Sequence, residues 1–287
     1  MKHDSLIKLF RSRDPNDLFE FYNHFRNKEE LFEWMKNRPP PKMKFMEVNG
    51  ATDVIVVIPT PTAKNKFVQN CKELFKGLHI IFVVSSGENF NFARCNNTGI
   101  CLALRYNPRW IIMSNDDMIG VDPIYKLTDI LSKIDNRKVD CLVPDTLNNT
   151  FRVYEPRVLI KFFRSYYNLL HKFDINRVIL DESGGKIRRF VVKVFLYKPV
   201  TDRFRNVADL YVLSGEYARK KNGLVYDTTF INDSEDIKLS FEVKKRLRIV
   251  KFKISRYKSG GAHFTRDFSR TLRAVAGLSY LNFIQKW

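Results

Sequence analysis

The sequence lacks the segments that would place it in a membrane or on a secretory route. No apolar run approaches the roughly 20 residues of a membrane-crossing helix, and the opening residues MKHDSLIKLF lack the long apolar stretch of a secretory signal. We therefore expect an intracellular, cytoplasmic protein.

Cysteine spacings typical of structural zinc sites are also missing. The four cysteines, Cys71, Cys95, Cys101 and Cys141, form no C-x-x-C pair and have no accompanying His-x-x-x-His. This excludes a zinc-finger type of site, and we expect four buried thiols.

Acidic residues are scarce beside basic ones, with 31 Asp+Glu against 50 Lys+Arg in 287 residues and a formal net charge of +19. Such an excess attracts polyanions, which include nucleic acid, anionic membrane surfaces and pyrophosphate-bearing substrates. The basic residues extend from Lys2 to Lys286 without a zinc finger, an RNP-type segment or a Gly-Arg tract. We therefore expect no nucleic-acid partner. A basic nucleic-acid-binding protein is the alternative function that the net charge leaves open.

Continuous apolar strands alternate with amphipathic helices through the middle of the chain. Strands are predicted over 53–58, 80–84, 110–113 and 139–143, and helices over 64–76, 92–106 and 124–134. This order predicts an α/β fold of three layers with a mostly parallel central sheet. The functional site is then expected at the ends of the strands.

Two adjacent carboxylates, Asp116 and Asp117, follow the third of these strands. At ~4 Å and an effective dielectric of ~20 they would repel each other by about 4 kcal/mol, so a cation nearby is expected to offset the charge. Carboxylate oxygens suit Mg²⁺ or Mn²⁺, whereas a solvated turn is the alternative, because Asn-Asp-Asp is also good turn chemistry.

Several segments, in order over roughly residues 52–265, resemble the family 2 glycosyltransferases of the GT-A fold. The segments are VIVVIPT, NFARCNNTGICLAL with WIIMSNDDM, residues 212–216 with 223–240, and SGGAH at 259–263. The resemblance implies a GT-A fold, a nucleotide-diphosphate-sugar donor, Mg²⁺ or Mn²⁺ as cofactor, and transfer of the sugar to an acceptor hydroxyl by an inverting single displacement.

The resemblance also implies a role for particular residues on the donor side. Asn115 and Asp117 occupy the outer positions of a DxD-type motif, so Asp117 is the expected metal ligand and Asn115 contacts the ribose. The expected donor-binding residues are Pro59, Thr60, Ser85, Arg94, Asn97, Asn115 and Asp116. His263 is either a further metal ligand or a loop histidine that touches phosphate or solvent.

On the acceptor side, the resemblance makes Asp236 the base that takes the proton of the acceptor hydroxyl. Glu235 then orients the acceptor or shares that role, and the expected acceptor-binding residues are Ser214, Gly215 and Glu216. An ordinary pair of carboxylates at a helix start is the alternative for Glu235 and Asp236. The acceptor is expected to be a glycan, a lipid-linked glycan or a protein.

The chain is expected to divide into a helical N-terminal extension with a Pro-rich linker (1–48), a GT-A catalytic domain (49–265, with halves 49–145 and 146–265) and a basic amphipathic C-terminal helix (266–287). That helix either rests on an anionic membrane surface, at the inner face, or packs on the domain or a second subunit. The sequence of the second half also predicts a helix over 161–173 and a hairpin of 177–180 with 186–197.

A GT-A-like protein without activity is a further alternative, because Asn115 and Ser85 depart from the family pattern.

Overall fold

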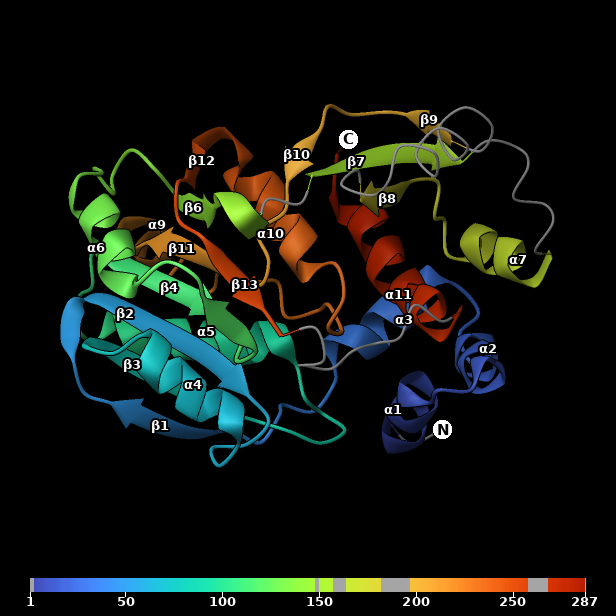
Figure 1. Ribbon diagram of the computed structural model, residues 1–287. Coiled ribbons are helices and arrows are strands. Elements are labelled where there is room, and N and C mark those ends of the chain that lie inside the picture. Colours follow the sequence, from blue (N-terminus) through green and yellow to red (C-terminus); the bar gives the residue numbers. More distant parts are fainter. Residues whose placement is uncertain (1–2, 148–149, 157–163, 182–196, 258–267, 287) are drawn as a thin grey trace.

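The computed structural model describes residues 3–147, 150–156, 164–181, 197–257 and 268–286 (Figure 1). Its centre is a seven-stranded sheet. The strands follow one another as β1 (Lys44–Val48), β3 (Leu78–Val84), β2 (Ala51–Thr60), β4 (Trp110–Ser114), β11 (Leu210–Ser214), β6 (Cys141–Pro144) and β12 (Leu247–Val250). Strands β3, β2, β4, β6 and β12 run parallel, and β1 and β11 run opposite to them. The predicted α/β fold with a mostly parallel sheet is confirmed.

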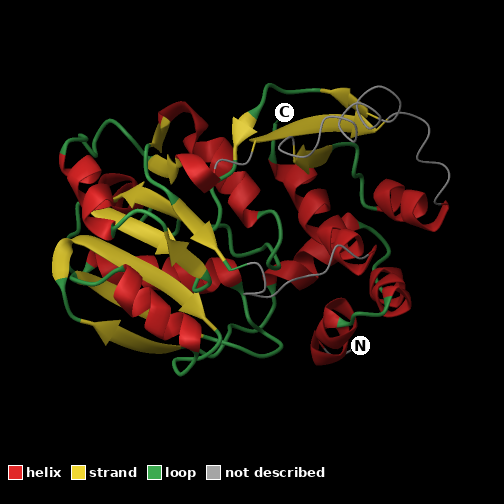
Figure 2. Cartoon of the chain, in the orientation of Figure 1, coloured by secondary structure: helices red, strands yellow, loops and turns green. Residues whose placement is uncertain are grey.

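The central strands are continuously apolar because both faces of the sheet are covered. Every residue from Val54 to Ile58 in β2 is buried. Figure 2 shows helices on both faces of the sheet. One face packs against α4 (Lys66–Leu74) and α6 (Ile124–Ser132), and the other against α5 (Phe92–Leu104), α9 (Gly215–Lys220) and α10 (Glu235–Val243).

The N-terminal boundary of the sheet differs from the prediction. Residues 44–48 were assigned to the extension, but β1 pairs antiparallel with β3 at the edge of the sheet. Its residues are only partly buried or exposed, so it carries none of the continuous apolar character that identified the central strands. The sheet therefore begins before residue 49.

A second core joins both ends of the chain. It contains residues of α1 (His3–Arg11), α2 (Pro15–Asn23), α3 (Lys28–Lys36), α7 (Arg164–Lys172) and α11 (Phe268–Ile284). The Tyr22 hydroxyl donates a hydrogen bond to the Leu272 carbonyl at 2.7 Å, which ties α2 to α11. Leu272, Val275 and Leu281 of α11 are fully buried in this core, so the apolar face of the tail helix packs on the rest of the chain. Within the described ranges, no helix is both long and apolar enough to cross a membrane.

Two small sheets complete the fold. Strand β7 (Thr150–Pro156) pairs antiparallel with β8 (Val178–Asp181), β9 (Tyr197–Pro199) and β10 (Phe204–Arg205), and β5 (Met118–Gly120) pairs with β13 (Ile254–Arg256). In the predicted hairpin 177–180 pairs with 186–197; β8 pairs with β7, and residues 186–196 lie outside the described ranges.

Helix α10 lies between the two cores. Leu239 and Val243 pack in the core of the main sheet, whereas Ile237 and Phe241 pack in the core built by α2, α3 and α11. Both sides of α10 are thus fixed, and its first residues, Glu235 and Asp236, are held in a defined position.

Candidate active site

The candidate site lies at the carboxyl ends of the central strands β2 and β4. Because β11 runs antiparallel to β4, its start meets the end of β4, with Leu210 opposite Ser114. This geometry gathers side chains from three strands and from the start of α10. The residues concerned are Thr60, Asn115, Asp116, Asp117, Asn206, Asp209, Glu235 and Asp236.

Asp116 is held from the neighbouring strand. The Thr60 hydroxyl donates a hydrogen bond of 2.7 Å to its Oδ2, and both side chains are buried. The Cys71 thiol of α4 donates to the Asp116 main-chain oxygen at 3.2 Å. Asp116 therefore has an ordered carboxylate with a fixed orientation.

Asp117 is the least satisfied carboxylate of this strand end. It is 6% exposed, and its buried Oδ1 accepts no hydrogen bond from any described residue. Burial, and then the negative charges of Asp209 and Asp116, raise its pKa. An orphaned oxygen among like charges fits a divalent cation, because Mg²⁺ and Mn²⁺ prefer carboxylate oxygens and usually keep several water or phosphate ligands.

Asp209, which sequence reasoning missed, lies beside this strand end at the start of β11. Its main chain has φ of 59°, its carbonyl accepts from the Asn115 N–H at 2.8 Å, and its Oδ1 accepts from the Asn115 amide at 3.2 Å. Arg256 of β13 donates to the same Oδ1 at 3.2 Å. The charge of Asp209 raises the pKa of both Asp117 and Asp236, so it lies within electrostatic reach of both.

The two carboxylates at the start of α10, Glu235 and Asp236, differ in their hydrogen bonds and in how far their pKa values are raised. Asp236 accepts hydrogen bonds from the Asn206 amide at 3.1 Å and from the Ile237 N–H at 2.8 Å. Burial raises its pKa to about 6 against the lowering effect of the Asn206 bond. Glu235 is 5% exposed, and its Oε2 has no partner among the described side chains. Burial and the charge of Asp236 raise the pKa of Glu235 well above its usual value, which favours its neutral form.

Several predicted donor-binding residues form side-chain hydrogen bonds with main-chain groups of the protein. The Asn97 amide donates to the Tyr226 carbonyl at 2.8 Å and accepts from the Tyr226 N–H at 2.9 Å. Arg94 donates to the Arg38 carbonyl at 3.0 Å, and the Ser85 hydroxyl to the Lys42 carbonyl at 2.9 Å. Pro59 lies within β2 opposite Val83. These polar side chains hold the loops around the site, and their own contacts are internal.

Ser214, Gly215 and Glu216, the predicted acceptor-binding residues, lie apart from the carboxylates of the candidate site. Ser214 lies opposite Trp110, at the start of β4, whereas Asp117 follows the end of that strand. The Ser214 hydroxyl donates to the Asn136 carbonyl at 2.6 Å, and a Cβ on Gly215 would meet the Pro108 carbonyl oxygen at 2.1 Å. Glu216 pairs with Arg219.

His263 lies outside the described residues. In the part of the chain that the structure describes, no three His, Cys, Asp or Glu side chains form a group that could hold a metal ion. The cysteine prediction needs one correction, because Cys71, Cys95 and Cys141 are buried but Cys101 is exposed.

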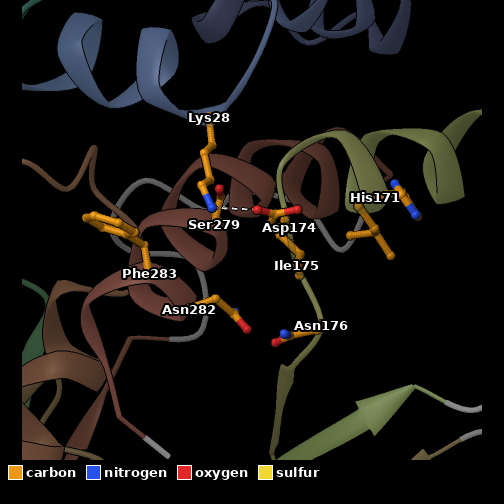
Figure 3. Close-up of a pocket in the computed structure, with 9 residues that line it drawn as sticks. Lys28, His171, Asp174, Ile175, Asn176, Ser279, Asn282 and Phe283 are labelled. Atoms are coloured by element: carbon orange, nitrogen blue, oxygen red, sulfur yellow. Dashed lines mark hydrogen bonds and ion pairs between the residues drawn. The ribbon is translucent and has the colours of Figure 1, made fainter.

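A separate cavity of about 450 Å³ opens between α3, α7 and α11 (Figure 3). Lys28 and Asp174 form an ion pair at this cavity, and Phe283 and Asn282 line it. The carboxylates described above do not line it.

The site predicts an unusual pH dependence of stability. Burial raises the pKa of Asp116, Asp117, Glu235 and Asp236 above the values of the unfolded chain, so the folded state binds protons more tightly. Stability then falls as pH rises from the unfolded carboxyl pKa of about 4 towards the folded pKa, which is about 6 for Asp236. We expect the melting temperature, measured by calorimetry, to rise by several degrees between about pH 7.5 and about pH 5.5.

Removing the titrating groups checks the origin of this effect. Glu235→Gln and Asp236→Asn together should abolish most of the rise. Glu242→Gln on the same helix should preserve it, because Glu242 pairs with Lys221 and Lys238 at the surface. A melting temperature of the unaltered protein that falls as the pH is lowered from about 7.5 to about 5.5 would contradict the assignment.

A scan against protein-family models matches no family to this chain, and a search of curated proteins finds no similar sequence.

Proposed function

We propose that the protein is a glycosyltransferase of the GT-A type, which transfers a sugar from a nucleotide-diphosphate donor to an acceptor hydroxyl with inversion. One observation carries the proposal. Asp117, with an unsatisfied buried oxygen, and Asp236, whose pKa burial raises to about 6, both lie within electrostatic reach of Asp209, where β2 and β4 of a mostly parallel sheet end. The ends of parallel strands are where such folds commonly bind nucleotides.

The donor side of the site rests on Asp117, with Asp116 and Asp209 near it. Asp117 would hold Mg²⁺ or Mn²⁺ through its unsatisfied oxygen, and the ion would supply Lewis-acid stabilisation of the charge that develops on a leaving diphosphate. Thr60 fixes the Asp116 carboxylate by its hydrogen bond of 2.7 Å. Arg256, bonded to Asp209, adds a positive charge beside the same position. The chain thus provides both carboxylates for a cation and a guanidinium for phosphate oxygens.

The acceptor side rests on Asp236. A carboxylate with a pKa of about 6 is mostly ionised at neutral pH and retains more basicity than an ordinary aspartate, which suits a general base. Asn206 orients it from the strand side through the bond to Oδ2. Glu235, whose pKa is raised well above its usual value, keeps its proton more readily and leaves the role of base to Asp236.

A thermal-shift screen of nucleotide-sugars, each with and without Mn²⁺, tests the proposal. A true donor should raise the melting temperature in a metal-dependent way, because a ligand that binds only the folded state stabilises it by mass action. Free nucleotides without the sugar serve as a comparison, and release of nucleotide diphosphate then confirms turnover. If no nucleotide-sugar shifts the melting temperature with or without metal, the proposal fails.

A further inference from the structure

A small cavity of about 170 Å³ lies beside the turn that leads into α10. Arg11 from α1 and Arg270 and Arg273 from α11 line it, together with Asp233 of the turn. Asp233 precedes Asp236 by three residues, and its charge raises the pKa of Asp236. The cavity therefore lies at the turn that precedes the proposed base, and a carboxylate that lines it, Asp233, affects the pKa of that base.

Neutral carbonyl groups hold two of these arginines in place. Arg11 donates to the Gly87 carbonyl at 3.0 Å and to the Phe90 carbonyl at 2.8 Å. Arg273 donates from Nε to the Phe10 carbonyl at 3.1 Å and from Nη2 to the Ser12 carbonyl. These bonds fix the orientation of both guanidinium groups at the cavity.

The charges around the cavity are mainly positive. Burial and the charge of Arg273 lower the pKa of Arg11, and Glu88 opposes this effect. Behind them, burial and the charges of Arg94 and Arg11 lower the pKa of the buried Arg38 to about 9. Among the described lining residues, Asp233 carries the carboxylate; it accepts a hydrogen bond from Ser234, and burial raises its pKa whereas Ser234 and Arg270 lower it.

We propose that this cavity is a binding site for a phosphate or diphosphate group carried by the acceptor. Guanidinium groups bind phosphate oxygens through paired, charge-assisted hydrogen bonds. The cavity is smaller than the roughly 300–1,000 Å³ of sites for drug-sized molecules, which suits a small anionic group. Phe10 and Ile231 add an apolar wall for the carbon chain next to that group.

The assignment to the acceptor rests on the proposed function. The donor diphosphate is expected at Asp117 with its cation, whereas this cavity adjoins the residues that activate the acceptor hydroxyl. Binding of the anion itself depends on neither the metal nor sugar transfer, so the two proposals can fail separately.

The test is calorimetric titration of the full chain with inorganic pyrophosphate in the presence of a chelator, so that no metal-mediated binding occurs. The unaltered protein should bind, Arg270→Gln should weaken binding by about tenfold or more, and Arg270→Lys should retain part of it. Arg270 is exposed, so its replacement should not prevent folding. Arg137→Gln is the matched control, because Arg137 is an exposed arginine that pairs with Asp135.

Two further arms locate and identify the ligand. Asp117→Asn should keep metal-free pyrophosphate binding, and loss of binding in that variant would place the anion at the donor site and overturn the assignment. Equal weakening by Arg270→Gln and Arg137→Gln, or no binding by the unaltered protein, would overturn it as well. Tighter binding of geranyl diphosphate than of pyrophosphate would identify a lipid-linked source, and the reverse order a soluble one.

Discussion

Replacing Asp236 by asparagine is expected to lower kcat by about 10²–10⁴-fold, which is the usual contribution of a general base. The substitution keeps the size of the side chain and the bond with the Ile237 N–H, but it removes the carboxylate that we propose accepts the proton. Donor binding should persist, so the metal-dependent thermal shift of the donor should be nearly unchanged. The measurement is steady-state turnover with the donor that the screen identifies.

The same experiment separates loss of chemistry from loss of structure. Asp236→Asn removes a buried carboxylate whose pKa is raised, so its folded state should be at least as stable at neutral pH. Glu242→Gln, on the same helix, should leave turnover within about twofold, because an exposed ion pair contributes little. Turnover of Asp236→Asn within threefold of the unaltered protein would show that another group is the base. In the unaltered protein, kcat/KM should fall as the pH drops below about 6, because only the ionised carboxylate can accept the proton.

Replacing Asp117 by asparagine is the second large effect that we expect. Saturating Mn²⁺ with donor, at about 100 times the dissociation constant, should stabilise the unaltered protein by about 2.7 kcal/mol, which corresponds to roughly 5–10 °C in melting temperature. Asp117→Asn should lose most of this shift and lower turnover by about 10²-fold or more, since metal stabilisation of the leaving group is worth several kcal/mol.

The control for this variant is another Asp→Asn change. Asp129 lies on α6 and pairs with Lys133 at the surface, so Asp129→Asn should keep the full metal-dependent shift. If Asp117→Asn and the unaltered protein respond equally to Mn²⁺ with donor, the cation binds elsewhere. In that case the role of the Asp116 and Asp117 strand end would be structural.

The sequence predicts the central strands and helices of the fold better than it predicts which residues form the candidate site. Runs such as Val54–Ile58 and Trp110–Met113 identify strands buried on both faces, and the helices between them follow from their spacing. Asp116 and Asp117 could be located for the same reason, because they directly follow such a run. Strand β1, whose residues are exposed or partly buried, has no comparable pattern.

The direction of β11 is what the sequence could not supply. The run Leu210–Ser214 is apolar, and a strand parallel to its neighbours would bring the residues after Ser214 to the site edge. Because β11 is antiparallel to both β4 and β6, its beginning lies there instead. This reversal removes Ser214 and Glu216 from the site and adds Asp209. Arg256 depends likewise on the register of β13 with β5, which pairs residues more than a hundred positions apart.

The packing of α11 has a consequence for the order in which the protein matures. Gly277 lies against the turn before α10, where a Cβ would meet the Asp233 carbonyl oxygen at 2.9 Å, and the Tyr22 hydroxyl is bonded to the Leu272 carbonyl. During synthesis, α1–α3 emerge before α11 and cannot complete their shared core until α11 has followed. Ile237 and Phe241 of α10 share that core, so Glu235 and Asp236, the carboxylates proposed for the site, should become ordered only once α11 has joined it.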